Sequence, residues 1–277
     1  MAKRLILNAD DLGYDKETNE TVEALVRAGL VTAVSLLAPA PAAEDAAQKM
    51  RALGFAVGAH LSLQSDDKSA LWTGLSGAKG LEALPGEMKA LTFGVTRAAA
   101  KTELAAQFAF PIARGLKADH VDAHAGALYG LALRRFSLDA FALAGQAGLP
   151  FRFPKTPDFF LRQTGFRFVP AVKALHKVLL RQAKKQKVLL PDDVFSDPRA
   201  PDRIASKEEL FSCYLRAVEN CREGVTEIFL HPRADDAVPG TAWAKRNWEF
   251  ELLNSRRLHD AAAKSGVKIV TPEEAYK

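Results

Sequence analysis

Short apolar runs rich in β-branched residues alternate with longer segments of helical spacing along this 277-residue chain. Such alternation is typical of a parallel sheet whose strands are connected by helices. Runs such as "AVSLLA" and "EIFLH" contain no alternating polar residues, which indicates strands buried on both faces. The predicted strands are residues 4–7, 31–37, 55–59, 120–123, 149–153, 226–230 and 267–270, and the predicted helices are residues 17–28, 42–53, 98–114, 131–147, 170–187, 206–222 and 243–264. The sequence therefore predicts an α/β fold with about seven parallel strands.

Two stretches interrupt the alternation. The first is residues 64–96, which are rich in Gly, Ser and Asp. The second is residues 154–169 together with the later residues 190–204, which are also irregular. Long irregular insertions in a compact domain often serve as substrate walls or lids. We see no repeat and no linker, and 48% hydrophobic residues suit one large core. We therefore expect a single domain over residues 1–277.

The charge pattern excludes some partners. The 38 Lys and Arg residues outnumber the 33 acids, for a net charge of +5, but they are scattered and form no basic stripe with interleaved aromatic residues. We therefore predict no nucleic-acid partner. The densest basic cluster, residues 181–187, is interpreted as the solvated end of a helix, where cations suit the helix dipole.

The expected location is the cytoplasm. No apolar run reaches the length of about 18 residues that a membrane span needs, and the short run before Asn8 is no secretory signal. The two cysteines, Cys213 and Cys221, would lie roughly 12 Å apart along a helix, which is too far for a disulfide. Reduced thiols fit a cytoplasmic protein.

Acids and histidines follow four of the predicted strands. Asp10 and Asp11 come after the first strand, His60 after the third, His124 after the fourth and His231 after the sixth. Because parallel α/β folds build their sites at the carboxyl ends of strands, these side chains are candidates for one functional site.

The stretch "HVDAH" would direct His120, Asp122 and His124 to one face of a strand. His124, at the strand end, is the better candidate for a metal ligand, with an aspartate available to orient a ligating histidine. Alternatively, His120 and Asp122 simply pair within the sheet. His60 stands alone in an apolar strand, and such a histidine is more often a satisfied core residue than a ligand.

One aspartate with two histidines can hold a divalent cation and leave positions open for water and substrate. Zinc fits the nitrogen ligands best, and the set also accepts magnesium, manganese, cobalt, nickel or iron. Two adjacent carboxylates need solvent, a cation or a shared proton, so one acid would bind the metal while its neighbour takes a proton. The alternative is a solvated turn. His231 could act as a general acid or merely cap a strand.

The motifs "NADDLG", "VGAHLSL", "HVDAH" and "IFLHP" occur in this order, and together with the C-terminal "RRLHDAAAKSGVKIVTPEEA" they resemble the YdjC/ChbG-like carbohydrate deacetylase family, which includes hopanoid-associated members. The resemblance implies a distorted (β/α) barrel that holds a divalent metal and removes N-acetyl groups from amino sugars. It implies Asp11, His60 and His124 as metal ligands, Asp10 as the base and His231 as the late histidine of the site. It also implies a homodimer.

The mechanism expected from these residues is hydrolysis by a metal-activated water, with zinc or magnesium as the first candidates for the metal. Two alternatives stay open. The same three ligands serve other metal-dependent enzymes, such as non-haem iron oxygenases or phosphoesterases. Many family members carry a histidine-rich string where Ala125 and Gly126 follow His124 here, and Phe where Leu12 stands. A non-catalytic carbohydrate-binding or degenerate member is therefore the second alternative.

Overall fold

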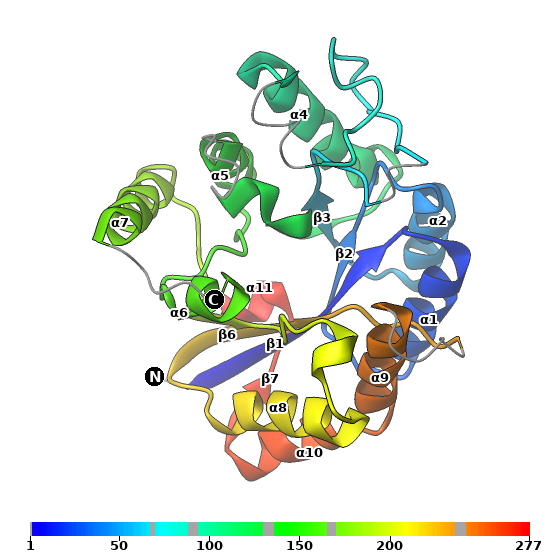
Figure 1. Ribbon diagram of the computed structural model, residues 1–277, viewed down its shortest axis with the longest axis vertical. Helices are drawn as coiled ribbons and strands as arrows, with labels where there is room; N and C mark the ends of the chain where they lie inside the picture. The colour runs from blue at the N-terminus through cyan, green and yellow to red at the C-terminus, as the bar shows by residue number, and fades with distance from the viewer. Residues whose placement is uncertain (1, 67–69, 88–93, 130–135, 165–169, 236–241) are drawn as a thin grey trace.

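The computed structural model describes residues 2–66, 70–87, 94–129, 136–164, 170–235 and 242–277, and its centre is a seven-stranded sheet in which every strand pair is parallel (Figure 1). The strand order is β4-β3-β2-β1-β6-β5, and β7 also pairs with β1. The strands are β1 (Lys3–Leu12), β2 (Ala33–Leu36), β3 (Val57–Leu61), β4 (Ala118–Ala123), β5 (Asp193–Phe195), β6 (Gly224–Leu230) and β7 (Val267–Ile269). The predicted α/β class and the number of parallel strands are confirmed.

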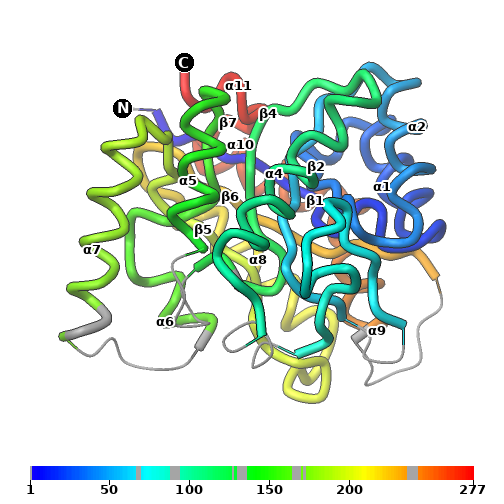
Figure 2. Tube along the Cα trace, turned by 90° about the horizontal axis from the view of Figure 1, so that it is seen from above, coloured from blue at the N-terminus to red at the C-terminus, as the bar shows by residue number. Residues whose placement is uncertain are grey.

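Helices surround the sheet, as Figures 1 and 2 show from two directions. They are α1 (Lys16–Arg27), α2 (Ala43–Leu53), α4 (Arg97–Ala113), α5 (Phe136–Ala147), α6 (Asp158–Thr164), α7 (Pro170–Lys185), α8 (Lys207–Glu219), α9 (Ala242–Asn254), α10 (Arg257–Lys264) and α11 (Pro272–Ala275), with short 3-10 turns η1 (His124–Tyr129) and η2 (Pro201–Arg203). The two chain termini lie near each other in both views.

The two faces of β1 have different partners. Leu5 and Leu7 belong to a large apolar cluster that packs against the covering helices. Asn8 and Asp10 alternate with them and point to the inner side of the curved sheet, where Asn8 bonds Ser35 of β2 at 2.7 Å. The inner side is therefore lined by hydrogen-bonded polar groups, although these strands are buried on both faces.

Close packing on the inner side requires a glycine in β3. A Cβ atom added to Gly58 would lie 2.1 Å from Nε2 of His120, which is far closer than van der Waals contact. Any larger residue here would displace the His120 ring and the groups bonded to it.

Backbone hydrogen bonds close the sheet toward a distorted barrel beyond β4. The Val121 N–H donates to the Pro150 carbonyl, and the Arg152 N–H donates back to the Val121 carbonyl, each at 2.9 Å. On the other side the Phe151 N–H donates to the Leu189 carbonyl at 2.9 Å. The predicted strand at residues 149–153 is wrong as a regular strand, because prolines at 150 and 154 have no N–H to continue a ladder.

Two other predictions need correction, and a third is only partly covered by the described residues. The helix predicted over residues 243–264 is two helices. Arg256 has a φ of 61°, which interrupts the helical backbone between α9 and α10. Residues 154–169 contain the helix α6, and residues 190–204 contain the strand β5. Part of the helix predicted at 131–147 lies outside the described residues, and α5 begins at Phe136.

Candidate active site

The end of β1 directs two neighbouring acids to one cavity. The pairing of β1 with β2 shifts register between Ala9 and Leu12, and Asp11 has a φ of 64°, in the left-handed region. Because consecutive side chains of a regular strand point to opposite faces, this irregular backbone allows Asp10 and Asp11 to line the same cavity. Their exposed fractions are 2% and 0%, so the pair is no solvated turn.

The structure brings together one aspartate and two histidines from three strand ends. Oδ1 of Asp11 lies 3.1 Å from Nδ1 of His124 and 3.4 Å from Nε2 of His60. All three side chains are buried, and their donor atoms lie within 4.8 Å of one another. One carboxylate oxygen and two imidazole nitrogens at this spacing fit a divalent metal, zinc in particular.

His60 is held from behind by a carboxylate. Its Nδ1 lies 2.7 Å from Oδ1 of Asp122, which belongs to the neighbouring strand β4. Burial alone would lower the pKa of His60, but the Asp122 and Asp10 carboxylates outweigh it and raise this pKa to about 10. Such an aspartate behind a histidine is the arrangement that orients histidine ligands in metal sites.

Asp11 and His124 also have outer partners. Arg246 of α9 donates to Oδ2 of Asp11 at 2.6 Å, while Asp66 lies 2.7 Å from Nε2 of His124. Burial would raise the pKa of Asp11, but Arg246 and His124 hold it well below its usual range. Burial would lower the pKa of His124, and the Asp11 and Asp66 carboxylates raise it to about 9.

Asp10 is fixed by a buried arginine. Arg152 donates to Oδ2 of Asp10 at 2.7 Å and to Oδ1 at 2.8 Å, and Asn8 donates to the same Oδ1 at 2.5 Å. The guanidinium also lies 2.7 Å from Asp122 and 2.5 Å from Glu227. Burial raises the pKa of Glu227, and Arg152 opposes that rise. The Arg152 guanidinium therefore forms ion pairs with three carboxylates, one each from β1, β4 and β6.

His231 follows β6 and faces Asp10. Its Nε2 lies 3.9 Å from Oδ2 of Asp10, and its side chain is 30% exposed. Behind the ring, Oε2 of the buried Glu249 accepts the backbone N–H of His231 at 2.7 Å and lies 3.7 Å from Nδ1. Tyr214 donates to the other Glu249 oxygen at 2.6 Å, so the group behind His231 is itself held in place.

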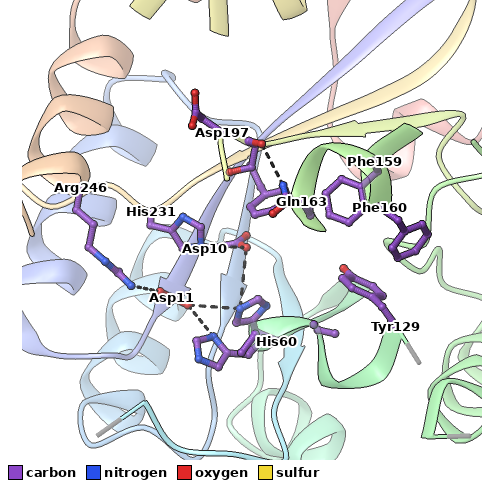
Figure 3. A pocket seen from close by; sticks show the side chains of 16 residues that line it. Asp10, Asp11, His60, Tyr129, Phe159, Phe160, Gln163, Asp197, His231 and Arg246 are labelled. Carbon is purple, nitrogen blue, oxygen red and sulfur yellow. Dashed lines mark hydrogen bonds and ion pairs between the residues drawn. The ribbon is translucent and has the colours of Figure 1, made fainter. Parts of the chain in front are cut away.

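These side chains line a cavity of about 380 Å³ with two different sides (Figure 3). In this view Asp10, Asp11, His60, His231 and Arg246 gather on one side, and Tyr129, Phe159 and Phe160 stand on the other. The rings that line the cavity are Tyr129, Phe159, Phe160 and Phe229. The cavity thus combines a charged, hydrogen-bonding wall with an apolar wall, as small-molecule sites commonly do.

Residues in and near the irregular stretches differ in whether they reach the cavity. Tyr129, Phe159 and Phe160 line the cavity. Trp72 is buried behind it with its ring 5.5 Å from that of His124. The side chains at 192 and 193 are engaged elsewhere: one accepts the N–H of residue 225 at 2.8 Å, and the other accepts from the guanidinium at 162 at 2.8 Å.

His120 does not reach the cavity lining. Its Nδ1 lies 2.6 Å from Oδ1 of Asp119, and its Nε2 lies 3.5 Å from Oδ2 of Asp122. The pairing of His120 with Asp122 within the sheet, which was one of the two interpretations of "HVDAH", is therefore found. Asp122 also contacts Nδ1 of His60, so its carboxylate interacts with both histidines.

Sequence patterns did not identify four residues that contact this site: Asp66, Arg152, Arg246 and Glu249. Of these four, only Arg152 could have been suspected from the sequence. It is the one charged residue in the apolar run "LPFRFP", and a buried arginine is stable only when acidic groups pair with it. The others come from a loop and from α9, whose local sequences do not distinguish them from surface charges.

The comparisons with known proteins agree with this fold. The family model described as YdjC-like protein matches residues 4–264. A carbohydrate deacetylase of Geobacillus stearothermophilus is 27% identical over 284 residues, covering 100% of both chains. A solved structure from Enterococcus faecalis V583, provisionally named a cellobiose-phosphate cleavage protein, is 24% identical, covers 99% of both chains and has a TM-score of 0.73, which indicates a shared fold.

Within the described residues, every helix is too short or too polar to cross a lipid bilayer.

Proposed function

Because this chain belongs to the YdjC-like family, we propose that it is a metal-dependent hydrolase that removes an N-acetyl group from an amino-sugar substrate, an oligosaccharide or a glycolipid. The observation that carries this proposal is the separation of two kinds of group in one cavity. Asp11, His60 and His124 are spaced as ligands of one metal ion would be, while Arg152 orients the Asp10 carboxylate beside them and His231 faces it.

A divalent metal held by Asp11, His60 and His124 would lower the pKa of a bound water and polarise the acetyl carbonyl. Imidazole nitrogens favour zinc among the candidate metals.

Asp10 is the proposed general base. Its two oxygens are fixed by Arg152, so the carboxylate is oriented before substrate arrives. Its Oδ2 also lies 4.0 Å from Nε2 of His60, which places the carboxylate directly beside the ligand set. A carboxylate in this position can accept the proton that the attacking water loses.

His231 is the proposed general acid. Its Nε2 faces the same Asp10 oxygen at 3.9 Å, so the proposed acid and base border the same part of the cavity. The buried Glu249 behind the ring accepts the His231 backbone N–H and lies 3.7 Å from Nδ1, which keeps the residue in place. Donation of its proton to the departing nitrogen would release a free amine and acetate.

The cavity walls support a sugar as the substrate. Aromatic rings such as Tyr129, Phe159 and Phe160 offer apolar faces against which the C–H side of a sugar ring packs, while the charged wall offers hydrogen-bond partners. The carbohydrate deacetylase relative supports the same substrate class. The free thiols of Cys213 and Cys221 fit the reducing cytoplasm, which is the proposed location.

The test is acetate release from a panel of N-acetylated amino-sugar oligosaccharides and glycolipids by zinc-loaded protein. Because general bases contribute about 10²–10⁴-fold, Asp10→Asn should lower turnover by about that factor while zinc stays bound. Asp202→Asn, an exposed acid on η2, is the matched control and should retain full activity. Sugar binding without acetate release by the wild type would contradict hydrolysis, and full activity of Asp10→Asn would contradict the assigned base.

A further inference from the structure

His124 is engaged at both ring nitrogens, and only one of its partners belongs to the ligand set. Nδ1 faces Asp11 at 3.1 Å, while Nε2 lies 2.7 Å from Oδ1 of Asp66. We propose that Asp66 is a positioning residue that accepts the Nε2 proton of His124 and so reserves Nδ1 for the metal. This inference rests on the metal-dependent function proposed above.

The arrangement matches that of the other histidine ligand with the nitrogens exchanged. His60 points Nε2 toward Asp11 and gives Nδ1 to Asp122, whereas His124 points Nδ1 toward Asp11 and gives Nε2 to Asp66. In each ring the nitrogen away from Asp11 contacts a carboxylate at 2.7 Å. A carboxylate in this place fixes the ring tautomer and orientation and raises the basicity of the ligating nitrogen.

Asp66 is carried by the irregular insertion after β3, and the described part of this insertion is anchored. The Ser65 hydroxyl donates to the Leu84 carbonyl at 2.8 Å and accepts the Trp72 N–H at 2.7 Å. The Trp72 ring then packs 5.5 Å from the His124 ring. The insertion therefore contacts His124 both through a hydrogen bond and through ring packing.

A second anchor ties the start of the insertion to α4. The side chain of Gln107 accepts the Ser62 N–H at 2.9 Å and donates to the Ser62 carbonyl at 2.7 Å. Only three residues separate this anchored Ser62 from Asp66. The position of the Asp66 carboxylate is thus set by the fold, as a positioning role requires.

The exposure of Asp66 makes the idea testable without breaking the core. Its side chain is 30% exposed, whereas that of Asp122 behind His60 is completely buried. Asp66→Ala removes the acceptor, and Asp66→Asn keeps an oxygen that can still accept the Nε2–H. Glu82→Ala is a matched control, because it removes a carboxylate of the same insertion that accepts the Gly80 N–H at 2.8 Å.

The experiment measures zinc affinity of the metal-free full-length protein by competition with a chromogenic chelator. Loss of an outer partner typically weakens metal binding about 10–100-fold, so we expect this loss in Asp66→Ala and a smaller one in Asp66→Asn. Glu82→Ala should stay within about twofold of wild type. Thermal unfolding of the metal-free variants verifies that each is folded. Wild-type affinity in a folded Asp66→Ala protein would overturn the proposal.

A second measurement reads the tautomer directly. Selective ¹⁵N-histidine labelling gives signals from only six histidines, and long-range ¹H–¹⁵N correlation distinguishes the two ring nitrogens. In the zinc-loaded wild type we expect His124 to carry its proton on Nε2 and His60 to carry its proton on Nδ1. A His124 proton on Nδ1 would refute the proposal even if Asp66→Ala failed to fold.

The two proposals fail in different ways. A wild type that binds zinc but releases no acetate would refute the deacetylase function and leave the role of Asp66 intact. An enzyme that releases acetate but whose zinc affinity does not depend on Asp66 would refute the role of Asp66 and leave the deacetylase function intact.

Discussion

Replacing Arg152 with methionine should destabilise the protein strongly, because this side chain neutralises three buried carboxylates. Arg152 is 2% exposed and lies within 2.5–2.8 Å of Asp10, Asp122 and Glu227. Methionine has a comparable apolar stem, so the variant removes the charge and its hydrogen bonds more than it removes packing. The acids would then be left in a buried place without their cation.

The magnitude follows from the cost of breaking a buried ion pair, about 3–5 kcal/mol when one partner is removed. For a protein of this size a loss of 1 kcal/mol lowers Tm by about 2–4 °C, so the expected decrease is about 6–20 °C at neutral pH. Protonation of the carboxylates would reduce this loss of stability, because a neutral carboxyl group is less costly to bury than a charged one. Because burial already raises the pKa of Glu227, this relief should grow as the pH falls, and the deficit should be smaller at pH 5 than at pH 8.

The assay is thermal unfolding of metal-free protein by circular dichroism at both pH values. Arg27→Met is the control, because Arg27 is exposed and pairs with Glu23 one turn earlier. Such surface pairs are worth less than about 1 kcal/mol, so this control should unfold close to the wild type. An Arg152→Met variant within about 2 °C of wild type at neutral pH would refute the reasoning.

Two further predictions concern the histidines. Burial lowers the pKa of His60 and His124, but nearby carboxylates outweigh it and raise these pKa values to about 10 and about 9. The protonated histidines therefore stabilise the folded state fully below their pKa in the unfolded chain, about 6.5. This stabilisation is lost as the pH rises through 9–10. Tm of the metal-free protein should therefore fall between pH 7 and pH 10, and a flat profile would contradict the charged network. For His231→Gln we expect kcat to fall by about 10²–10⁴-fold with zinc content unchanged, and a kcat within tenfold of wild type would exclude His231 as the general acid.

Much of the fold could be predicted because parallel strands buried on both faces leave continuous apolar runs in the sequence. β5 escaped prediction because Asp193–Phe195 is only three residues long and is held by pairing with β6, not by a pattern of its own. The break at Arg256 escaped because neither glycine nor proline marks it. The pairing that holds β5 joins segments distant in sequence, which local patterns do not contain.

The site was predictable to the extent that it lies at strand ends. Asp10, Asp11, His60, His124 and His231 all line the cavity, as their positions after predicted strands suggested. The groups that orient them come from elsewhere. Arg246 and Glu249 stand on α9, whose charged residues look like any solvated helix face until the fold brings them to β1 and β6.

The central claim is that Asp11, His60 and His124 hold a divalent metal. The most direct measurement is elemental mass spectrometry of protein loaded with zinc and desalted, with His124→Ala treated identically and His259→Ala as a control outside the cavity lining. The account predicts near-stoichiometric zinc in the wild type and in His259→Ala, and loss of zinc from folded His124→Ala. Equal metal content in wild type and His124→Ala, whether high or negligible, would contradict it.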